Sequence, residues 1–563
     1  MKKKIIPVLV AILLILIVIA AGFGTKIIEK YSYSKERVDL RDYYSLVEDN
    51  DVALILQDDI LEAKGKLVNG TYYLDFETVQ TYFNDRFYVD KVENLLIYTT
   101  PTDIISAPIE GNTVSISGVQ GEEAYVIATY QEDKLYIAID YVKKYTNISY
   151  EVFTEPNRMQ IDTVWPMRKI ADVAKDSAIR YQGGIKSDIL EDVSVGDVVV
   201  VLEEMNTWVK VKSSDGIIGY MEKKRISNER EEMQEPVTDV AVPEYTNLTK
   251  DYKINLGWHQ VTNPTANSSL QSLLAQTKSI NTVSPTWFSL SDNNGNFTSL
   301  ASADYVTYAH NLGIEVWALI DNFNTQVNTN EVLSSATKRA YLIQGLVNEV
   351  LQYNIDGINI DFEQISVDTG QNFIEFIREL SIACRANGIV LSIDNYVPKE
   401  YSAHYNRKEQ GIVADYVIIM GYDEHYGGGG VAGSVASIDF VEEGIQKTLE
   451  EVPSNKVINA IPFYTRIWST KGTEVTSQNT GMGVAESFLA QRNVEPVWSD
   501  ENCQNYAEFQ EGDTLYQVWI EDAQSVEVKL NIMKKYNLAG VAEWKLGLET
   551  ANVWDSIANY VNN

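Results

Sequence analysis

The sequence predicts an α/β protein that ends in a (β/α)8 TIM barrel. From Tyr252 onward, eight apolar runs alternate with polar loops and helical stretches over about 300 residues, the pattern of a barrel with eight parallel strands. The fourth run, GINIDFE, carries its polar residues at alternate positions, as expected for a strand with one packed face and one polar face. An N-terminal transmembrane helix, an α+β repeat region and a small all-β barrel are expected before it.

The apolar runs set the order of the barrel strands. They are INLGWHQ (254–260), TVSPTWFSL (282–290), EVWALIDNF (315–323), GINIDFE (357–363), VLSIDNYV (390–397), YVIIMGYD (416–423), VINAIPFYT (457–465) and GVAEWKLG (540–547). Helical candidates between them include Glu331–Tyr353, Gln371–Asn387 and Ser437–Glu451. The longest gap, 466–539, predicts a small insertion as well as the last helix before the eighth strand.

The N-terminus predicts a membrane anchor over residues 1–33. Residues 5–24 are about the twenty apolar residues that a helix needs to span a bilayer. Lys2, Lys3 and Lys4 precede them, which places the N-terminus in the cytoplasm by the positive-inside rule. The alternative is a cleaved signal peptide and a secreted protein. In both cases the remaining domains lie outside the membrane.

Residues 34–165 contain an internal repeat. At a constant offset, GTYYLDFETVQTYFNDRFYVDKVENLLIYTT from Gly70 aligns with DKLYIAIDYVKKYTNISYEVFTEPNRMQIDT from Asp133. Each copy predicts a strand, a short helix and two further strands, so the region is α+β. The repeat resembles the stalk-like module at the N-terminus of copper amine oxidases, but without a histidine cluster it implies no copper. We expect a spacer or a wall-contact module.

Residues 166–228 predict a small all-β barrel, because short strands alternate with polar turns. Val198–Leu202 and Trp208–Val211 are the expected core strands, Ser213–Gly216 a turn and Gly219–Met221 a closing strand. The order R-x-G, G-D-x-V, W-x-K-V and G-x-x-G-Y resembles bacterial SH3-like domains, which implies a cell-wall peptide as a partner. A passive spacer is the alternative. Residues 229–250 are predicted to be a linker, and 251–563 the TIM barrel.

The composition excludes several classes of function. The chain of 563 residues carries 46 Lys and Arg against 79 Asp and Glu, a formal net charge of −33, which argues against a nucleic-acid partner. Cys384 and Cys503 are far apart, and the four histidines are scattered, so we expect neither a metal site nor a cofactor.

Parity on the fourth strand separates its residues into two faces. Side chains alternate along a strand, so one face is apolar and the other polar. The apolar face holds Ile358, Ile360 and Phe362; the polar face holds Gly357, Asn359, Asp361 and Glu363. Catalytic residues of TIM barrels lie at the C-terminal ends of strands. We therefore expect Glu363 at the barrel mouth, whereas Asp356 points the other way and is structural.

The motif Asp356-Gly357-x-x-x-Asp361-x-Glu363 resembles the fourth-strand signature of glycoside hydrolase family 18, the chitinase-like enzymes. Three further features carry the resemblance: Met420-Gly421-Tyr422-Asp423 at the sixth strand, Trp544 on the eighth, and SPTWF with IPFYTRIW on the second and seventh. The motifs SPTWF and IPFYTRIW look like those of the branch that trims peptidoglycan. Many chitinases have Asp where this chain has Asn359, and we expect the Asn359 amide to donate a hydrogen bond to Asp361 and keep it charged.

The resemblance implies acetamido-assisted, retaining catalysis, in which the 2-acetamido oxygen of the sugar attacks its own anomeric carbon. Glu363 is then the acid and base, with a pKa raised by a nearby carboxylate. Asp361 orients the acetamide and Tyr422 bonds its oxygen, so these three are the implied catalytic residues. Asp423, Met420, Asn359 and the stacking Trp544 are the implied substrate-binding residues; Asp356 and Gly357 are structural.

The implied substrate is a polysaccharide with N-acetylglucosamine, and the anchor, spacer and SH3-like domain favour peptidoglycan. Chitin is the alternative within the same reaction. A carbohydrate-binding lectin on an inactive barrel is the alternative from another class, although such lectins usually lose the acid that Glu363 supplies here.

Overall fold

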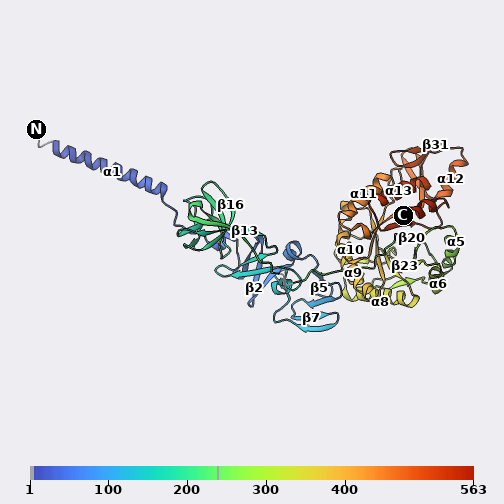
Figure 1. Cartoon of the computed structure of the whole chain (residues 1–563), viewed down its shortest axis with the longest axis horizontal. Helices are drawn as coiled ribbons and strands as arrows, with labels where there is room; N and C mark the ends of the chain where they lie inside the picture. The colour runs from blue at the N-terminus through green and yellow to red at the C-terminus, as the bar shows by residue number, and fades with distance from the viewer. Residues whose placement is uncertain (1–4, 238–239) are drawn as a thin grey trace. The chain divides into compact units, whose positions relative to one another are not determined.

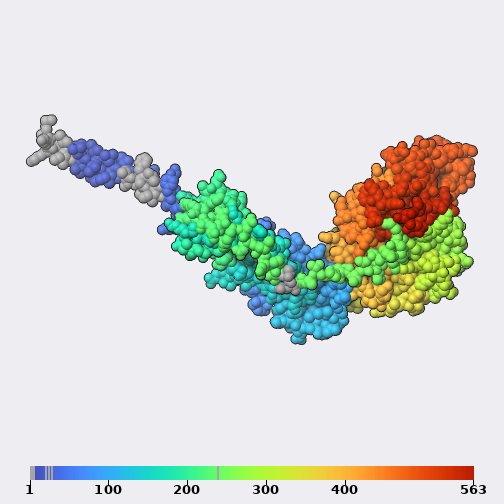
Figure 2. All heavy atoms as spheres, viewed as in Figure 1, coloured from blue at the N-terminus to red at the C-terminus, as the bar shows by residue number. Residues whose placement is uncertain are grey.

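The structure is a computed structural model that describes residues 5–237 and 240–563 of the chain. It is shown in Figures 1 and 2. The chain forms two compact units. The first comprises Met1–Phe87, Ala107–Val114 and Gln120–Val242; the second comprises Tyr88–Ser106, Ser115–Val119 and Pro243–Asn563. The second unit therefore combines the C-terminal region with a short segment from much earlier in the chain.

Helix α1 spans Ile5–Tyr31. Across the parts of the chain that the structure describes, no helix combines the length and the hydropathy that crossing a bilayer requires. The transmembrane anchor predicted over residues 1–33, which extends into undescribed residues, is thus not supported by the structure.

A seven-stranded sheet in the first unit contains the first strand of each repeat copy. Its order is β11-β12-β1-β2-β3-β10-β9. The strands are β1 (Asp51–Leu56), β2 (Asp59–Val68), β3 (Thr71–Asp75), β9 (Ala128–Gln131), β10 (Lys134–Ala138), β11 (Ser149–Phe153) and β12 (Arg158–Asp162). The equivalent strands β3 and β10 pair antiparallel, with Tyr73 opposite Ala138 and Asp75 opposite Tyr136. The resemblance to a stalk module stays a prediction.

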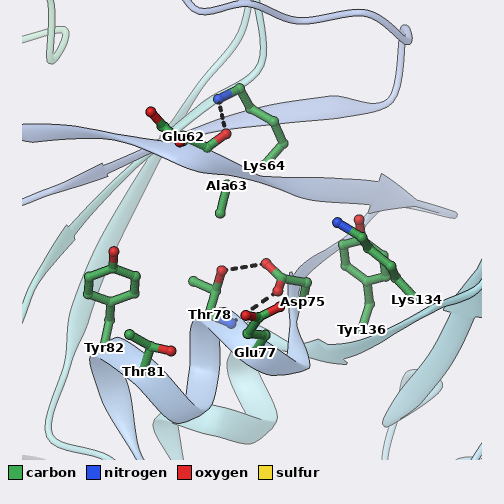
Figure 3. A pocket seen from close by; sticks show the side chains of 10 residues that line it. All are labelled: Glu62, Ala63, Lys64, Asp75, Glu77, Thr78, Thr81, Tyr82, Lys134 and Tyr136. Atoms are coloured by element: carbon green, nitrogen blue, oxygen red, sulfur yellow. Dashed lines mark hydrogen bonds between the residues drawn. The ribbon is translucent and has the colours of Figure 1, made fainter.

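An open polar pocket of about 450 Å³ lies beside β3 (Figure 3). Asp75 caps α3 (Phe76–Thr78) there, because its carboxylate accepts hydrogen bonds from the backbone N–H and the hydroxyl of Thr78. Lys64 donates to the carbonyl oxygen of Glu62, two residues away on the same strand β2. Each of these bonds joins residues two or three apart in the sequence, so they stabilise local structure around the pocket.

The predicted all-β barrel is a second seven-stranded sheet, ordered β15-β14-β18-β17-β16-β13-β19. Its strands are β13 (Met167–Val173), β14 (Ser177–Arg180), β15 (Ile189–Val193), β16 (Val198–Glu204), β17 (Trp208–Lys212), β18 (Ile218–Glu222) and β19 (Ile226–Met233). The three strands expected from the sequence are β16, β17 and β18. Part of the predicted linker is instead strand β19, which pairs with β13. The side chains of β19 are mostly exposed and charged, so its composition is that of a linker. The strand forms because its backbone pairs with β13.

Eight parallel strands close into a barrel in the second unit, in the order β20-β33-β27-β26-β25-β24-β23-β21, with β21 pairing back to β20. They are β20 (Ile254–His259), β21 (Thr282–Leu290), β23 (Glu315–Asp321), β24 (Gly357–Asp361), β25 (Val390–Tyr396), β26 (Tyr416–Met420), β27 (Val457–Pro462) and β33 (Gly540–Trp544). Every one falls in a predicted run. The predicted TIM barrel is therefore confirmed.

Helices surround the barrel strands, as the labels α5, α6, α8, α9, α10 and α11 around β20 and β23 show in Figure 1. They are α5 (Leu270–Leu274), α6 (Ala303–Asn311), α7 (Thr329–Leu333), α8 (Ala336–Tyr353), α9 (Val367–Asn387), α10 (Arg407–Val413), α11 (Ile438–Leu449), α13 (Ala523–Lys535) and α14 (Val553–Val561). The single helix predicted over Glu331–Tyr353 is two helices, because Ser335 leaves the helical conformation and caps α8 through the backbone N–H of Lys338.

The predicted insertion follows the seventh barrel strand. It is an antiparallel sheet of β28 (Tyr464–Lys471), β29 (Glu474–Gly481), β30 (Val497–Ser499), β31 (Gln504–Glu511) and β32 (Thr514–Ile520), with helix α12 (Met482–Ala490). It forms the orange-red lobe of this unit in Figure 2. The insertion begins directly after β27, so its first strand lies next to the mouth-forming end of the barrel.

Two short strands of the first repeat copy also belong to the second unit. They are β4 (Tyr88–Asp90) and β5 (Leu95–Thr99), which pair antiparallel. The equivalent strands of the second copy, β11 and β12, stay in the seven-stranded sheet of the first unit. Two copies with similar sequence thus place their last two strands in different units.

Candidate active site

The polar face of β24 lines the inside of the barrel as predicted. At its lower end Gly357 leaves room for an indole, because a Cβ there would lie 2.7 Å from Cδ1 of Trp317. Asn359, the next inward residue, is fully buried. Its Oδ1 accepts hydrogen bonds from Trp258 (2.9 Å) and Ser284 (3.2 Å).

The amide nitrogen of Asn359 donates to Asp394 Oδ1 (2.9 Å) and to Ser392 (3.1 Å). The expected bond from Asn359 to Asp361 is therefore wrong: the donor faces the neighbouring strand β25. With both amide atoms bonded to protein, Asn359 supports the site from below and has no atom left to bind a sugar.

Asp361 is the buried acid at the centre of the site. Its Oδ1 has no hydrogen-bond partner, which is rare for a buried carboxylate. Burial, then Asp394, Glu363 and Asp321, raise its pKa well above the ordinary value. The raised pKa contradicts the expectation that Asp361 stays charged more readily, and its Oδ1 is free to accept a hydrogen bond.

Glu363 follows β24 at the barrel mouth and is half-buried. Burial, together with Asp423 and Asp321, raises its pKa, while a hydrogen bond from the Tyr396 hydroxyl (2.7 Å) opposes the rise. A raised pKa is what an acid working near neutral pH requires. The direction agrees with the prediction, but burial rather than a neighbouring carboxylate is the larger cause.

Asn322 fixes the backbone at Glu363 from two sides. Its Oδ1 accepts from the Glu363 N–H (2.9 Å), and its Nδ2 donates to the Glu363 carbonyl (3.0 Å). Asn322 lies just after β23, so the neighbouring strand holds the backbone from which the Glu363 side chain projects.

Sequence reasoning missed three site residues: Asp321 at the end of β23, and Asp394 and Tyr396 on β25. Asp321 is directly opposite Asp361 in the strand register. Burial, and then Glu363, raise the pKa of Asp394 well above its ordinary value. The available signal is their position, since all three lie in the C-terminal half of apolar runs that predict barrel strands.

The residues predicted at the sixth strand also reach the mouth. Burial raises the pKa of the Tyr422 phenol well above its usual range, and Tyr464, Asp361 and Asp394 add to the shift. Its ring packs edge-on against Tyr464, with centroids 6.2 Å apart. Tyr422 therefore stays a neutral hydroxyl that can donate a hydrogen bond beside the buried acids.

Asp423, Met420 and Trp544 complete the rim. Asp423 is half-exposed and accepts from the Tyr464 hydroxyl (2.6 Å) and from Arg466 (3.4 Å). Trp544 is partly exposed and packs edge-on against Trp258 at 5.8 Å. Met420 lies buried at the end of β26. Trp544 thus stays partly exposed at the end of β33.

Asp356 lies at the opposite end of β24 and has a structural contact. Its Oδ2 accepts from the backbone N–H of Val316 (2.8 Å) and pairs with His310 Nε2 (2.8 Å). It therefore ties the start of β23 to β24, away from the mouth.

Residues 216–549 match the family model of the glycosyl hydrolases family 18, which covers more than half of the chain. The chain belongs to this family. Residues 177–227 match the model of the bacterial SH3 domain, so the second resemblance is confirmed as well.

Two curated relatives come from Bacillus subtilis (strain 168). The uncharacterized glycosylase YvbX is 27% identical over 47% of this chain and 80% of its own length. The cortical fragment-lytic enzyme is 26% identical over 43% of this chain and 59% of its own. Among solved structures, a chitinase from Chromobacterium violaceum aligns with a TM-score of 0.50 at 22% identity, over 55% of this chain and 99% of that chain, which supports the fold alone.

Proposed function

We propose that this family 18 barrel hydrolyses the β-1,4 bond next to an N-acetylglucosamine residue by acetamido-assisted, retaining catalysis. The observation that carries the proposal is Asp361 Oδ1, a buried acceptor without a donor directly below Glu363. The N–H of a 2-acetamido group is a donor of the right kind, and holding it there turns the acetamide oxygen toward the anomeric carbon of the same sugar.

In this mechanism Glu363 gives its proton to the leaving glycosidic oxygen while the acetamide oxygen forms the new bond to the anomeric carbon. The resulting oxazolinium ion is positively charged, and Asp361 lies beside it. Water then attacks the anomeric carbon, with Glu363 accepting its proton, and the acetamide is released. Tyr422 donates to the acetamide oxygen, and Trp544 offers a ring face beneath the sugar.

The electrostatics of the acid pair suit a cationic intermediate. Before reaction the buried Asp361 and Asp394 both favour their protonated forms, since burial disfavours charge and each is near other acids. Because a cation interacts favourably with nearby carboxyl groups, a cation formed above Asp361 is better accommodated there than a neutral sugar. Stabilisation is thereby strongest in the reacting state, which is the condition for accelerating a reaction.

Hydrolysis of matched acetylated and de-acetylated oligomers tests the mechanism. The acetylated glycan should be cleaved, and the de-acetylated one should bind without cleavage. Equal rates on both would mean that a protein carboxylate is the nucleophile. Tight binding of acetylated glycans without any cleavage would instead indicate a lectin.

Peptidoglycan is the substrate that we propose, and chitin is the second candidate. The support is the bacterial SH3 domain in the same chain and the likeness to a cortical fragment-lytic enzyme. Parallel digestion of purified peptidoglycan and of chitin oligomers, with mass analysis of the new reducing ends, separates the two. Faster cleavage of chitin would reverse the ranking.

A cell-wall peptide is the partner proposed for the SH3 domain. The edge strand β15 of this domain is already occupied by a segment that precedes the domain in the same chain. The Ile189 N–H donates to the Glu36 carbonyl, and the Val38 N–H donates to the Ile189 carbonyl. A nearby pocket of about 400 Å³ is lined by Tyr33, Arg180, Trp208 and Glu222. A peptide would therefore use this pocket. Trp208→Ala should weaken binding of the chain to insoluble peptidoglycan stripped of other polymers.

The proposed location is the outer side of the cell membrane, with secretion as the alternative. The support is the apolar run 5–24 behind three lysines in the sequence. The full-length protein should sediment with membranes and be released by detergent. A mature chain cut near Gly24 in the medium would favour secretion.

A further inference from the structure

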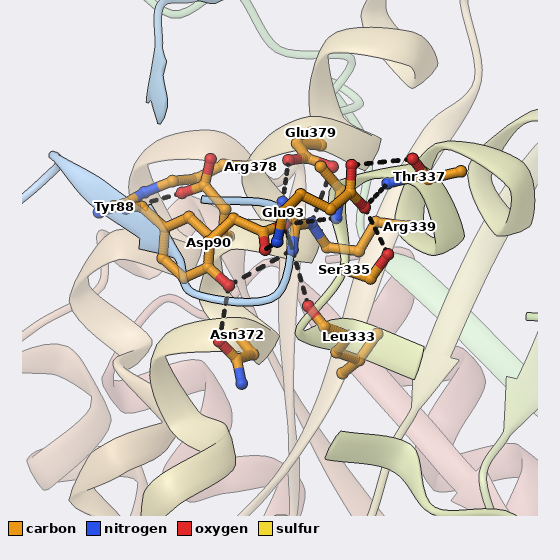
Figure 4. A network of polar contacts seen from close by, with 12 residues as sticks. Tyr88, Asp90, Glu93, Leu333, Ser335, Thr337, Arg339, Asn372, Arg378 and Glu379 are labelled. Carbon is orange, nitrogen blue, oxygen red and sulfur yellow. Dashed lines mark hydrogen bonds and ion pairs between the residues drawn. The ribbon is translucent and has the colours of Figure 1, made fainter. Parts of the chain in front are cut away.

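The N-terminal end of helix α8 contacts a hairpin from outside the barrel sequence. Asp90 Oδ2 accepts from the Ala336 N–H (2.6 Å), and Glu93 accepts from the Thr337 N–H (2.7 Å) and the Ser335 hydroxyl (2.5 Å). Figure 4 shows these acids of the β4–β5 hairpin pointing at the first turn of α8. Hydrogen bonds to the free N–H groups of a helix stabilise its start.

Arg339 is the centre of this contact and is fully buried. It forms a two-bond pair with Glu379 (3.0 and 2.8 Å), donates to the Leu333 carbonyl (2.8 Å) and lies 3.8 Å from Asp90. Its guanidinium also stacks on the ring of Tyr88 at 5.1 Å. One cation thus joins the hairpin, α9 and the end of α7.

Two short runs of hydrogen bonds, joined by the peptide bond between Thr329 and Asn330 of α7, link the same hairpin to the proposed acid Glu363. The Tyr88 hydroxyl donates to Asn372 Oδ1 (2.6 Å), and Asn372 Nδ2 donates to Asn330 Oδ1 in α7 (2.8 Å). At the start of α7, Thr329 accepts from Asn322 Nδ2 (3.1 Å). Asn322 is the residue that holds the Glu363 backbone on both sides.

The second repeat copy lacks this polar set. At the constant offset of the repeat, Glu151, Phe153 and Pro156 stand where the first copy has Tyr88, Asp90 and Glu93. Those residues lie in or beside β11, in the first unit. The acids and the tyrosine are therefore particular to the copy that meets the barrel.

We propose that Tyr88 and Asp90 are positioning residues for Glu363, acting through α7 and Asn322. The inference rests on the proposed role of Glu363 as the acid. Tyr88 reaches the start of α7 at Asn330 through Asn372. Asp90 lies beside Arg339, which donates to Leu333 at the end of α7. Thr329 of α7 in turn accepts a hydrogen bond from Asn322. Loss of one of these bonds lets the Glu363 backbone shift and admits water to its carboxyl group.

Tyr88→Phe is the variant that tests the proposal, because it removes only the hydroxyl. Its matched control is Tyr73→Phe, which removes the hydroxyl of an equally buried tyrosine bonded to the Val126 carbonyl in the other unit. In the full chain, Tyr88→Phe should lower kcat about three- to tenfold with little change in KM, since misplacement of a catalytic group affects the chemical step. The control should change neither.

A pH profile separates positioning from a loss of stability alone. Burial is the main cause of the raised pKa of Glu363. Hydration should therefore lower that pKa and move the basic limb of kcat/KM to lower pH in Tyr88→Phe. Adding Asn330→Ala to Tyr88→Phe should cost little more than either alone, because both break one series of bonds. Equal kcat and an unmoved basic limb in Tyr88→Phe would overturn the proposal.

Amide exchange gives a readout that does not depend on activity. In Tyr88→Phe, exchange at Glu363 and over α7 should be several-fold faster than in the wild type and in Tyr73→Phe. A wild type that cleaves no acetylated glycan would overturn the proposed function, while this exchange difference would still test the hairpin. Unchanged exchange at these amides would contradict the positioning role by itself.

Discussion

Two groups of buried acids in the same unit have opposite surroundings. Glu379 and Asp90 are as buried as Asp361 and Asp394. Burial raises the pKa of Glu379 to about 7, against the opposing effect of Arg339, with which it forms two hydrogen bonds. Asp361, by contrast, has an oxygen without any donor, and no cation in the described part of the chain contributes to its pKa shift.

The difference shows that two sets of buried acids in one unit can be compensated to very different degrees. A buried charge is tolerated when a cation and hydrogen bonds compensate for its lost hydration. The Glu379 group has this compensation, so its buried charges are tolerated and removing one partner is costly. The Asp361 group lacks a compensating cation, so burial favours the protonated forms of Asp361 and Asp394.

The largest expected effect is on the acid at the mouth. Glu363→Gln keeps the shape of the side chain but cannot donate the proton, so turnover should fall by about 10²-fold or more. Glu486→Gln, at an exposed position of α12, is the control and should keep full activity. An active Glu363→Gln enzyme would place the acid elsewhere.

The compensated group should matter for stability. Arg339→Leu leaves Glu379 and Asp90 buried without their cation, and breaking such a pair costs about 3–5 kcal/mol of the free energy of unfolding. Denaturant unfolding followed by tryptophan fluorescence measures this.

Lys471→Leu is the matched control, since it removes one partner of an ion pair whose two side chains are mostly exposed. Such surface pairs contribute about 0–1 kcal/mol. A small effect of Arg339→Leu would mean that the two acid groups are energetically alike.

The uncompensated acid Asp361 should make the stability of the folded chain depend on pH. In the wild type the pKa of Asp361 is raised in the folded state, so the folded chain binds more protons than the unfolded chain once pH exceeds the ordinary value of 3.8. Its contribution to stability is full below that pH and is lost as pH rises toward the folded pKa.

Asp361→Asn removes this titration and should make the stability of the enzyme fall less steeply with pH, while turnover drops. The measurement is the urea midpoint at several pH values for both proteins. A steeper fall in the variant would contradict the assignment of Asp361 as an uncompensated acid.

The smallest expected effect concerns Tyr396. Its hydrogen bond favours the ionised form of Glu363 and so limits the rise of that pKa. Tyr396→Phe should therefore raise the pKa of Glu363 further and move the basic limb of the pH–rate profile to higher pH. A shift to lower pH would mean that the hydroxyl mainly excludes water.

Much of the site follows from local patterns. The strand period places Asp361 and Glu363 on one face, and the position at a strand end places Glu363 at the mouth, as the structure confirms. The acceptor of the Asn359 amide could not be predicted from these patterns, because an amide can reach acids on its own strand or on the next one. Trp258 and Ser284 donate to its Oδ1, which turns the NH2 group toward Asp394.

The sequence by itself determined the barrel, its strand order, the insertion and the acid at the fourth strand. These are local, since apolar periodicity and strand parity act over a few residues. Only the tertiary structure decided which acids meet, because Asp321, Asp361 and Asp394 come together when neighbouring strands pair. The tertiary structure also decided that the β4–β5 hairpin of the first repeat copy contacts α8. That contact depends on Arg339, which is about 250 residues away along the chain.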